Sequence, residues 1–125
     1  MRKQYHLKPS GNGFYAWDVD ELIKKSKDFP VVKKKLLDLK DFDQPFWYQN
    51  NDIPTCRSIV EHMKLIQKTS LQYPIILSAE GSVMDGMHRI GKAYLKGLEY
   101  IDSVQFSETP KPDHINIDPD ELPYD

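Results

Sequence analysis

The sequence predicts a single α+β domain on three observations. Its 125 residues, of which 39% are apolar and 11% aromatic, suit one domain with its own core. Three segments carry the capping residues and the apolar spacing of helices. Short apolar runs bounded by proline and glycine are typical of strands. We expect this domain over residues 1–106, followed by a distinct tail over residues 107–125.

The first predicted helix covers about residues 19–28. It follows Asp18, a favourable N-cap residue, and Glu21 three residues later completes a capping-box pattern. The helix ends before Pro30, because the residue that precedes a proline avoids helical backbone. We expect its buried side to consist of Val19, Leu22 and Ile23.

The second predicted helix covers about residues 56–69, with Thr55 as its N-cap. Apolar residues at helical spacing are expected to face the core. These residues are Cys56, Ile59, Val60, Met63 and Ile66. The polar residues on or beside the other face are Arg57, Ser58, Glu61 and His62. Because Cys56 is the only cysteine, an internal disulfide and a cysteine-based zinc cluster are excluded.

A hairpin and a third helix complete the predicted core. Residues 74–78 form a short apolar run that favours a buried strand, and the turn at 79–82 returns the chain through residues 83–84. A helix is expected over about residues 86–96, and residues 100–106 alternate well enough to form a last strand. The buried residues of this helix are expected to be Ile90, Ala93 and Tyr94.

Charge is distributed unevenly along the chain. Residues 1–106 carry 16 basic and 13 acidic side chains, whereas residues 107–125 carry one basic and six acidic ones. A mildly basic body lacks the strongly basic face of DNA-binding proteins, so no autonomous DNA binding is expected. The tail holds four of the nine prolines and is predicted to be either disordered or wrapped around the body. Its candidate anchors are Ile115, Ile117, Leu122 and Tyr124.

Membrane and export signals are not evident in this sequence. No apolar run approaches the roughly 20 residues that cross a bilayer. The first residues lack the apolar region of a signal peptide. We therefore expect a cytoplasmic protein with no membrane partner.

The residues that carry chemistry concentrate in 83–89, where a predicted strand meets a predicted helix start. Backbone N–H groups at a helix start lack partners, and the helix dipole adds roughly half a positive charge. Gly86 lets a ligand approach the backbone, while His88 and Arg89 add cations to the first turn. A cation at the positive end of a helix dipole costs up to about 1 kcal/mol. Because the sequence accepts this cost, the helix start is predicted to bind phosphate. In the alternative interpretation, Asp85 caps the helix and the two cations face solvent.

Residues 85–89, Asp-Gly-Met-His-Arg, resemble the Gly-x-His-Arg signature of the ParB/sulfiredoxin superfamily. Residues 90–104 continue like the ParB N-terminal domain, in which a Gly-x-Arg-Arg helix precedes a glycine and a short strand. The helix, strand and hairpin before the signature come in the family's order, so the resemblance covers residues 54–106 most clearly. The whole chain is similar to small bacterial proteins that carry a ParB-like label.

The resemblance implies a small mixed sheet with packed helices, which binds ATP or CTP through the phosphates, with Mg²⁺ as the expected cation. The positions that match phosphate-binding or nucleotide-facing positions of the family are Gly86, His88, Arg89, Ser58 and His62. The lysine of sulfiredoxin falls at Thr55, and we expect Arg57 to supply that charge nearby.

Two departures from the family limit what is carried over. Sulfiredoxin needs a cysteine immediately before its His-Arg, and Met87 stands there, so a thioether replaces the nucleophilic thiol. ParB also needs a helix-turn-helix domain and a dimerisation domain, for which we expect no room in 125 residues.

Two other functions remain open alongside nucleotide binding. The chain is alternatively a small phosphotransferase or nucleotide hydrolase, with Asp85 or Glu61 as base and Asp85 as a candidate Mg²⁺ ligand. Against a catalytic role of Glu61 stands its spacing from Arg57, which favours a surface ion pair. The third hypothesis is a non-catalytic module whose acidic tail binds a protein partner.

The aromatic segment 46–48, Phe-Trp-Tyr, is predicted to plug a small core rather than to stack a nucleotide base. His6 and His114 lie in terminal segments, and we expect no functional role for either.

Overall fold

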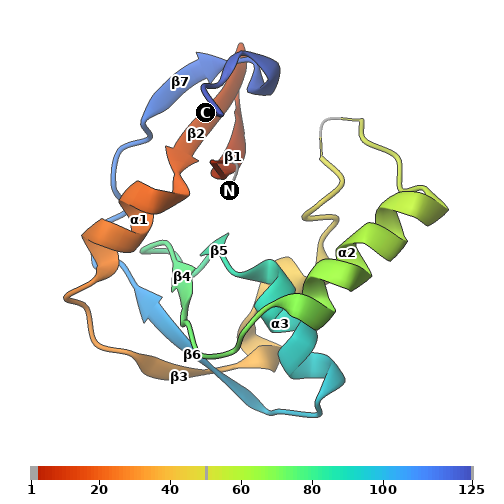
Figure 1. Ribbon diagram of the computed structural model, residues 1–125. Helices are drawn as coiled ribbons and strands as arrows, with labels where there is room; N and C mark the ends of the chain where they lie inside the picture. Colours follow the sequence, from red (N-terminus) through yellow and green to blue (C-terminus); the bar gives the residue numbers. More distant parts are fainter. Residues whose placement is uncertain (1–2, 50, 125) are drawn as a thin grey trace.

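The computed structural model describes residues 3–49 and 51–124 and shows an α+β protein with two small sheets (Figure 1). The predicted class is therefore confirmed. One sheet is antiparallel, in the order β1 (Tyr5–Ser10), β2 (Gly13–Asp18), β7 (His114–Ile117). The other is mixed, in the order β3 (Val32–Lys35), β6 (Tyr100–Gln105), β4 (Ile75–Leu77), β5 (Val83–Asp85). The antiparallel sheet was not predicted.

The α-helices are α1 (Val19–Ser26), α2 (Cys56–Lys68) and α3 (Met87–Leu95), each close to its predicted range. Short 3₁₀ turns occur at η1 (Leu36–Asp38), η2 (Lys40–Asp43) and η3 (Pro119–Glu121). Both predicted N-caps are confirmed: Asp18 accepts from the Asp20 N–H, and Thr55 accepts from the Ser58 N–H. Within the described part of the chain, no helix is long and apolar enough to cross a membrane.

Strand β4 is buried on both of its faces, which explains its uninterrupted apolar sequence. Because side chains alternate along a strand, Ile75 and Leu77 share one face and cluster with Ile90 of α3. Ile76 faces the opposite way and clusters with Trp17 of β2 and Leu22 of α1. The strand therefore joins both halves of the molecule.

The predicted buried face of α2 is wrong except at Ile66. Its other apolar positions are exposed, namely Cys56, Ile59, Val60 and Met63. The helix instead meets the body through Ser58, His62 and Ile66, which are four residues apart and so lie on one face. Figure 1 shows the start of α2 beside a loop rather than over a sheet, in agreement with the exposure of its apolar residues.

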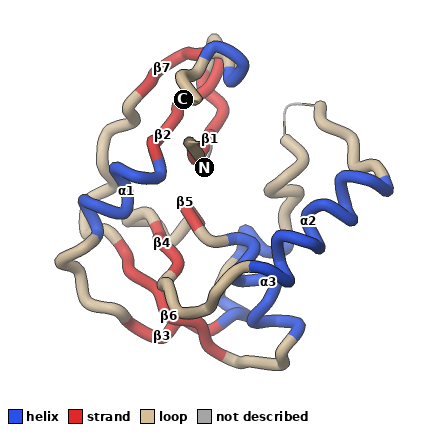
Figure 2. Tube along the Cα trace, in the orientation of Figure 1, coloured by secondary structure: helices blue, strands red, loops and turns tan. Residues whose placement is uncertain are grey.

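Polar contacts hold α2 in this orientation. The Ser58 hydroxyl lies 3.1 Å from the Tyr48 hydroxyl, in a segment that carries neither helix nor strand over residues 44–49 (Figure 2). At the other end, Lys92 of α3 donates to the carbonyls of Gln67 and Thr69 at 3.1 and 2.6 Å. A cation there satisfies the last carbonyls of α2 and complements its dipole.

Ile23 and Tyr94 are also exposed, contrary to prediction. α1 is buried through Val19, Leu22 and Ser26, and a residue one position from such a stripe points about 100° away. Tyr94 follows the buried Ala93 in α3 for the same reason.

The tail wraps around the body, which is one of its two predicted arrangements. Strand β7 pairs with β2, and the Trp17 indole N–H donates to the Pro110 carbonyl at 2.8 Å. The Lys3 N–H donates to the Tyr124 carbonyl at 3.1 Å, so the two ends of the chain lie together (Figure 1). Leu122 is buried, as expected of an anchor, but Ile115 is exposed.

A tail that belongs to the folded structure must contribute to its stability. We expect Leu122→Ala to lower the free energy of unfolding by about 2–3 kcal/mol, because it leaves a cavity at a buried site. Ile115→Ala, in the same tail but exposed, is expected to cost less than about 1 kcal/mol. Urea unfolding measures both values. Equal, small costs would show that the tail is not packed on the body.

Candidate functional site

The start of α3 is shaped by Gly86. Its backbone lies at φ 110° and ψ 20°, a left-handed conformation that glycine adopts without a Cβ penalty. A Cβ at this position would lie 2.6 Å from Cγ2 of the buried Ile75. No side chain of the described residues caps this helix start. Asp85 pairs instead with Arg89, at 2.7 Å from Oδ2 to Nη2, so its predicted alternative role as a cap is wrong.

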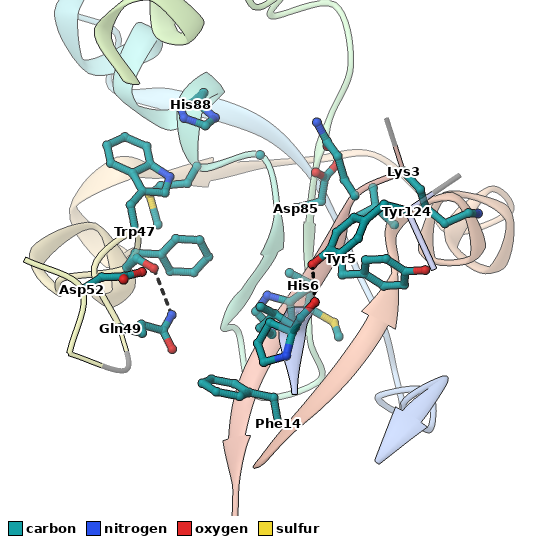
Figure 3. Close-up of a pocket in the computed structure, with 18 of the residues that line it drawn as sticks. Lys3, Tyr5, His6, Phe14, Trp47, Gln49, Asp52, Asp85, His88 and Tyr124 are labelled. Carbon is teal, nitrogen blue, oxygen red and sulfur yellow. Dashed lines mark hydrogen bonds between the residues drawn. The ribbon is translucent and has the colours of Figure 1, made fainter. Parts of the chain in front are cut away.

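This helix start opens into a cavity of about 800 Å³, which lies in the size range of small-molecule sites. Asp85, Gly86 and His88 line it together. In Figure 3, Trp47, Gln49 and Asp52 stand on one side, and Lys3, Asp85, Tyr5, His6 and Tyr124 on the other. The cavity therefore lies between residues 46–49 and Asp52 on one side and the β1–β2 hairpin on the other.

Trp47, His62 and His88 form a stack of three rings. The ring centroids of His62 and His88 lie 4.2 and 4.6 Å from that of Trp47, and 5.2 Å from each other. Such distances place both imidazoles on the same face of the indole. His62 Nδ1 lies 2.9 Å from His88 Nε2, and because one of these nitrogens must accept, at least one ring is neutral.

Burial keeps the histidines around the cavity neutral. It lowers the pKa of His88 to about 4, and the nearby His62 and Arg89 add to this effect. Burial also lowers the pKa of His62, although the Glu61 charge opposes the shift. The pKa of His6 falls to about 4 for the same reason, against the opposing charge of Asp41. His88 therefore serves this site as a neutral donor or acceptor and not as the cation that the sequence suggested.

The cavity wall carries more acidic than basic side chains. Asp52 and Asp85 line it, and the tail contributes Asp118 and Asp120. The basic residue of the wall, Lys3, already pairs with Asp18 and Asp20 at 2.9 and 3.4 Å. Binding of an anion in this cavity therefore requires the positive end of the helix dipole or a cation that enters with the anion.

The structure separates the predicted site residues. Asp85, Gly86 and His88 share the cavity, whereas His62 is outside its lining and contacts His88 and Trp47, which do line it. Arg57, Ser58 and Glu61 are not among the described residues that line it. The Ser58 hydroxyl accepts from the Thr55 N–H at 2.9 Å and completes the capping box of α2.

Arg89 and the proposed Arg57–Glu61 pair also differ from expectation. Arg89 lines a neighbouring cavity on the other side of Asp85. Arg57 and Glu61 are exposed, and the ion pairs among the described residues do not include them.

A metal ion would find few protein ligands here. Among the described residues, no three or more histidine, cysteine, aspartate or glutamate side chains are arranged to hold one. Asp85 remains the candidate ligand beside Gly86, and a bound ion would take its other ligands from a substrate or from water.

Several residues of the site were not identified from the sequence. Trp47 is part of the wall as well as a plug of the core, and His6 stacks on Phe46 with centroids 6.2 Å apart. A signal for His6 was present, because the turn around Gly11 is followed by an alternating aromatic run typical of a hairpin. No local signal places Asp118 at this cavity, since tertiary packing alone brings the tail there.

A scan against protein-family models found no match to this chain, and searches of the curated proteins and of the solved structures found none either.

Gly86 is tested by substitution. We expect Gly86→Ala to lower the free energy of unfolding by more than about 2 kcal/mol, because both φ and the contact with Ile75 are unfavourable. Gly97→Ala is the matched control: its φ is 73°, but a Cβ there meets nothing within 4 Å. Gly97→Ala therefore measures only the cost of placing alanine in left-handed backbone, about 1 kcal/mol. Urea unfolding measures both, and an equal cost would mean that the Ile75 contact relaxes freely.

The buried histidines predict a loss of stability in acid. Unfolded histidine has a pKa near 6.5, whereas folded His88 has a pKa of about 4, so the unfolded state binds more protons between these values. The contribution of neutral His88 to the free energy of unfolding is fully present above pH 6.5 and is lost as the pH falls toward 4. We expect the free energy of unfolding of His88→Gln to fall by about 1–2 kcal/mol less than that of the original protein over this range. The fall that remains in the variant includes the contribution of His6. Unfolding in urea between pH 4 and 7.5 measures it, and parallel curves for the two proteins would refute the assignment.

Proposed function

We propose that this cavity binds a nucleotide, with the phosphates at the start of α3 and the base against Trp47. The observation that carries the proposal is that the uncapped helix start opens, at Gly86, into a cavity of about 800 Å³. Free N–H groups and the helix dipole favour anions, and glycine has no side chain to hold a phosphate away.

Trp47 supports the position of the base. His62 and His88 occupy one face of its indole, and no ring contact among the described residues occupies the other. Stacking of a base on an aromatic side chain contributes about 1–3 kcal/mol and tolerates any base. Trp47 packs partly against the core and also lines the cavity, so the part of its indole that borders the cavity would be the surface for a planar ligand.

The acidic wall supports entry of the nucleotide with Mg²⁺. Phosphates alone would be repelled by Asp52, Asp85, Asp118 and Asp120. Mg²⁺ usually binds one or two carboxylates together with the phosphates of its substrate, which suits a site with Asp85 beside the helix start. The ion would neutralise phosphate charge there.

The order of elements supports a ParB/sulfiredoxin-like unit over residues 54–106, which we propose as the nucleotide-binding part. Helix α2, the β4–β5 hairpin, Gly86, α3 and β6 follow in the order that the resemblance requires. The sheet β1–β2–β7 lies outside this unit and supplies the opposite wall of the cavity.

Phosphoryl transfer or nucleotide hydrolysis is the second candidate. It is favoured by Asp85, the predicted base, which lines the cavity beside Gly86. A pKa of about 4 makes His88 a weak base, so His88 would act there as a hydrogen-bonding group. Glu61, the other predicted base, is exposed on α2 and does not support this reaction. Release of inorganic phosphate during nucleotide titration separates catalysis from binding alone. Binding of a protein partner by the acidic tail stays a prediction.

Calorimetric titration with ATP, CTP and GTP, each with Mg²⁺, tests the proposal. We expect at least one to bind with millimolar or better affinity, and Trp47→Leu to weaken it about tenfold through loss of stacking. Binding is expected to weaken when Mg²⁺ is removed, because the carboxylates then repel the phosphates.

Arg57→Gln is the matched control, because Arg57 was a sequence-based candidate that does not line the cavity. The nucleotide affinity of this variant is expected to stay within about twofold of that of the original protein. If all three nucleotides fail to bind at millimolar concentration, the proposal is wrong. If Arg57→Gln rather than Trp47→Leu abolishes binding, the ligand lies elsewhere.

A further inference from the structure

A second cavity, of about 740 Å³, adjoins the first along Val19 and Asp85. Its floor is formed by Ile76 of β4 and Val104 of β6, both buried. α1 borders one side, and Figure 1 shows this helix beside β4. The proposed nucleotide site does not use this space.

Exposed apolar side chains from three separate segments line this cavity. Ile23 comes from α1, Val31 from the segment before β3, and Tyr73 from the segment before β4. They are 52%, 56% and 59% exposed. Exposed apolar groups that converge on one concave surface, with an apolar floor, are characteristic of a ligand site.

Cations stand at the polar part of the wall. Arg89 lines the cavity and makes one hydrogen bond among the described residues, from Nη2 to Asp85. Its Nε is buried and has no acceptor among them. Lys27, at the end of α1, also lines the cavity and takes part in none of the ion pairs between described residues. The wall also carries Lys3, Asp20 and Asp85, of which Lys3 pairs with Asp20 and Asp85 pairs with Arg89. The excess of positive charge in the wall is therefore one cation, which favours an anionic group over a neutral one.

We propose that this cavity is a second binding site, for a small molecule with an apolar body and one anionic head, such as a medium-chain or aromatic carboxylate. The body lies on Ile76 and Val104 between Ile23 and Tyr73. The head lies beside Arg89, whose guanidinium lines the cavity and pairs with Asp85 through Nη2. The site is distinct from the proposed nucleotide site, because Arg89 and the apolar floor belong to this cavity, although Asp85 lines both cavities.

The fluorescent probe 8-anilinonaphthalene-1-sulfonate, which combines apolar rings with one sulfonate, tests the site. We expect fluorescence to rise and saturate at one probe per chain, and octanoate to displace it. Ile23→Glu is expected to weaken probe binding about tenfold or more, because it removes apolar wall and adds a like charge. Val31→Glu, in a loop, repeats the test should the helix variant unfold.

Ile59→Glu is the matched control, because Ile59 is also a helical isoleucine and is 54% exposed, but lies on α2 away from this cavity. Its probe affinity is expected to stay within about twofold, at the same net charge. Loss of binding in Ile59→Glu with retention in Ile23→Glu would place the probe on α2 and overturn the proposal. Circular dichroism of each variant verifies that it is folded.

The anionic head is tested by comparing octanoate with octanol as competitors. We expect octanoate to displace the probe at lower concentration, by about fivefold or more, since charge-assisted hydrogen bonds are the stronger ones. Octanol is the more apolar competitor, so equal or better displacement by octanol would show that Arg89 does not recognise the head.

Discussion

Burial of β4 on both faces is the constraint on which the rest of the structure depends. A three-residue strand whose side chains are all apolar must be covered from both sides. Ile75 and Leu77 bring α3 to one face, and Ile76 brings α1 and β2 to the other. The two cavities lie on either side of Asp85, at the end of the neighbouring strand β5. The elements that cover the two faces of β4 leave space between them at this point.

The Asp85–Arg89 ion pair separates the chemistry of the two cavities. Its carboxylate lines both, while its guanidinium lines only the apolar one. The side chains are 20% and 13% exposed, so solvent screens the pair only in part. Carboxylates outnumber the one cationic side chain in the first wall, whereas the second wall has three cationic side chains and two carboxylates. This difference in charge is why we assign them different ligands.

Helix α2 shows that polar contacts can decide which face of a helix is buried. Its apolar spacing predicts a buried stripe through Ile59 and Met63, yet both are exposed. Hydrogen bonds of Ser58 with Tyr48 and of His62 with His88 hold a face about 100° away from this stripe against the body. Each such bond contributes only about 1 kcal/mol, but a buried polar group left without its partner costs more, so the polar face is the one that pairs.

Local signals in the sequence determined the helices, their caps, the β4–β5 hairpin and the glycine-containing start of α3. Capping at Asp18 and Thr55 depends on neighbouring residues alone, which is why it could be predicted. Only the tertiary structure decided which face of α2 is buried, that the tail joins β2, and that His88 is neutral. These features depend on side chains far apart in the chain, such as the contact of His88 with Trp47 and the lining of one cavity by both Asp85 and Asp118. Burial and charge at a site are sums over neighbours that only the folded chain brings together.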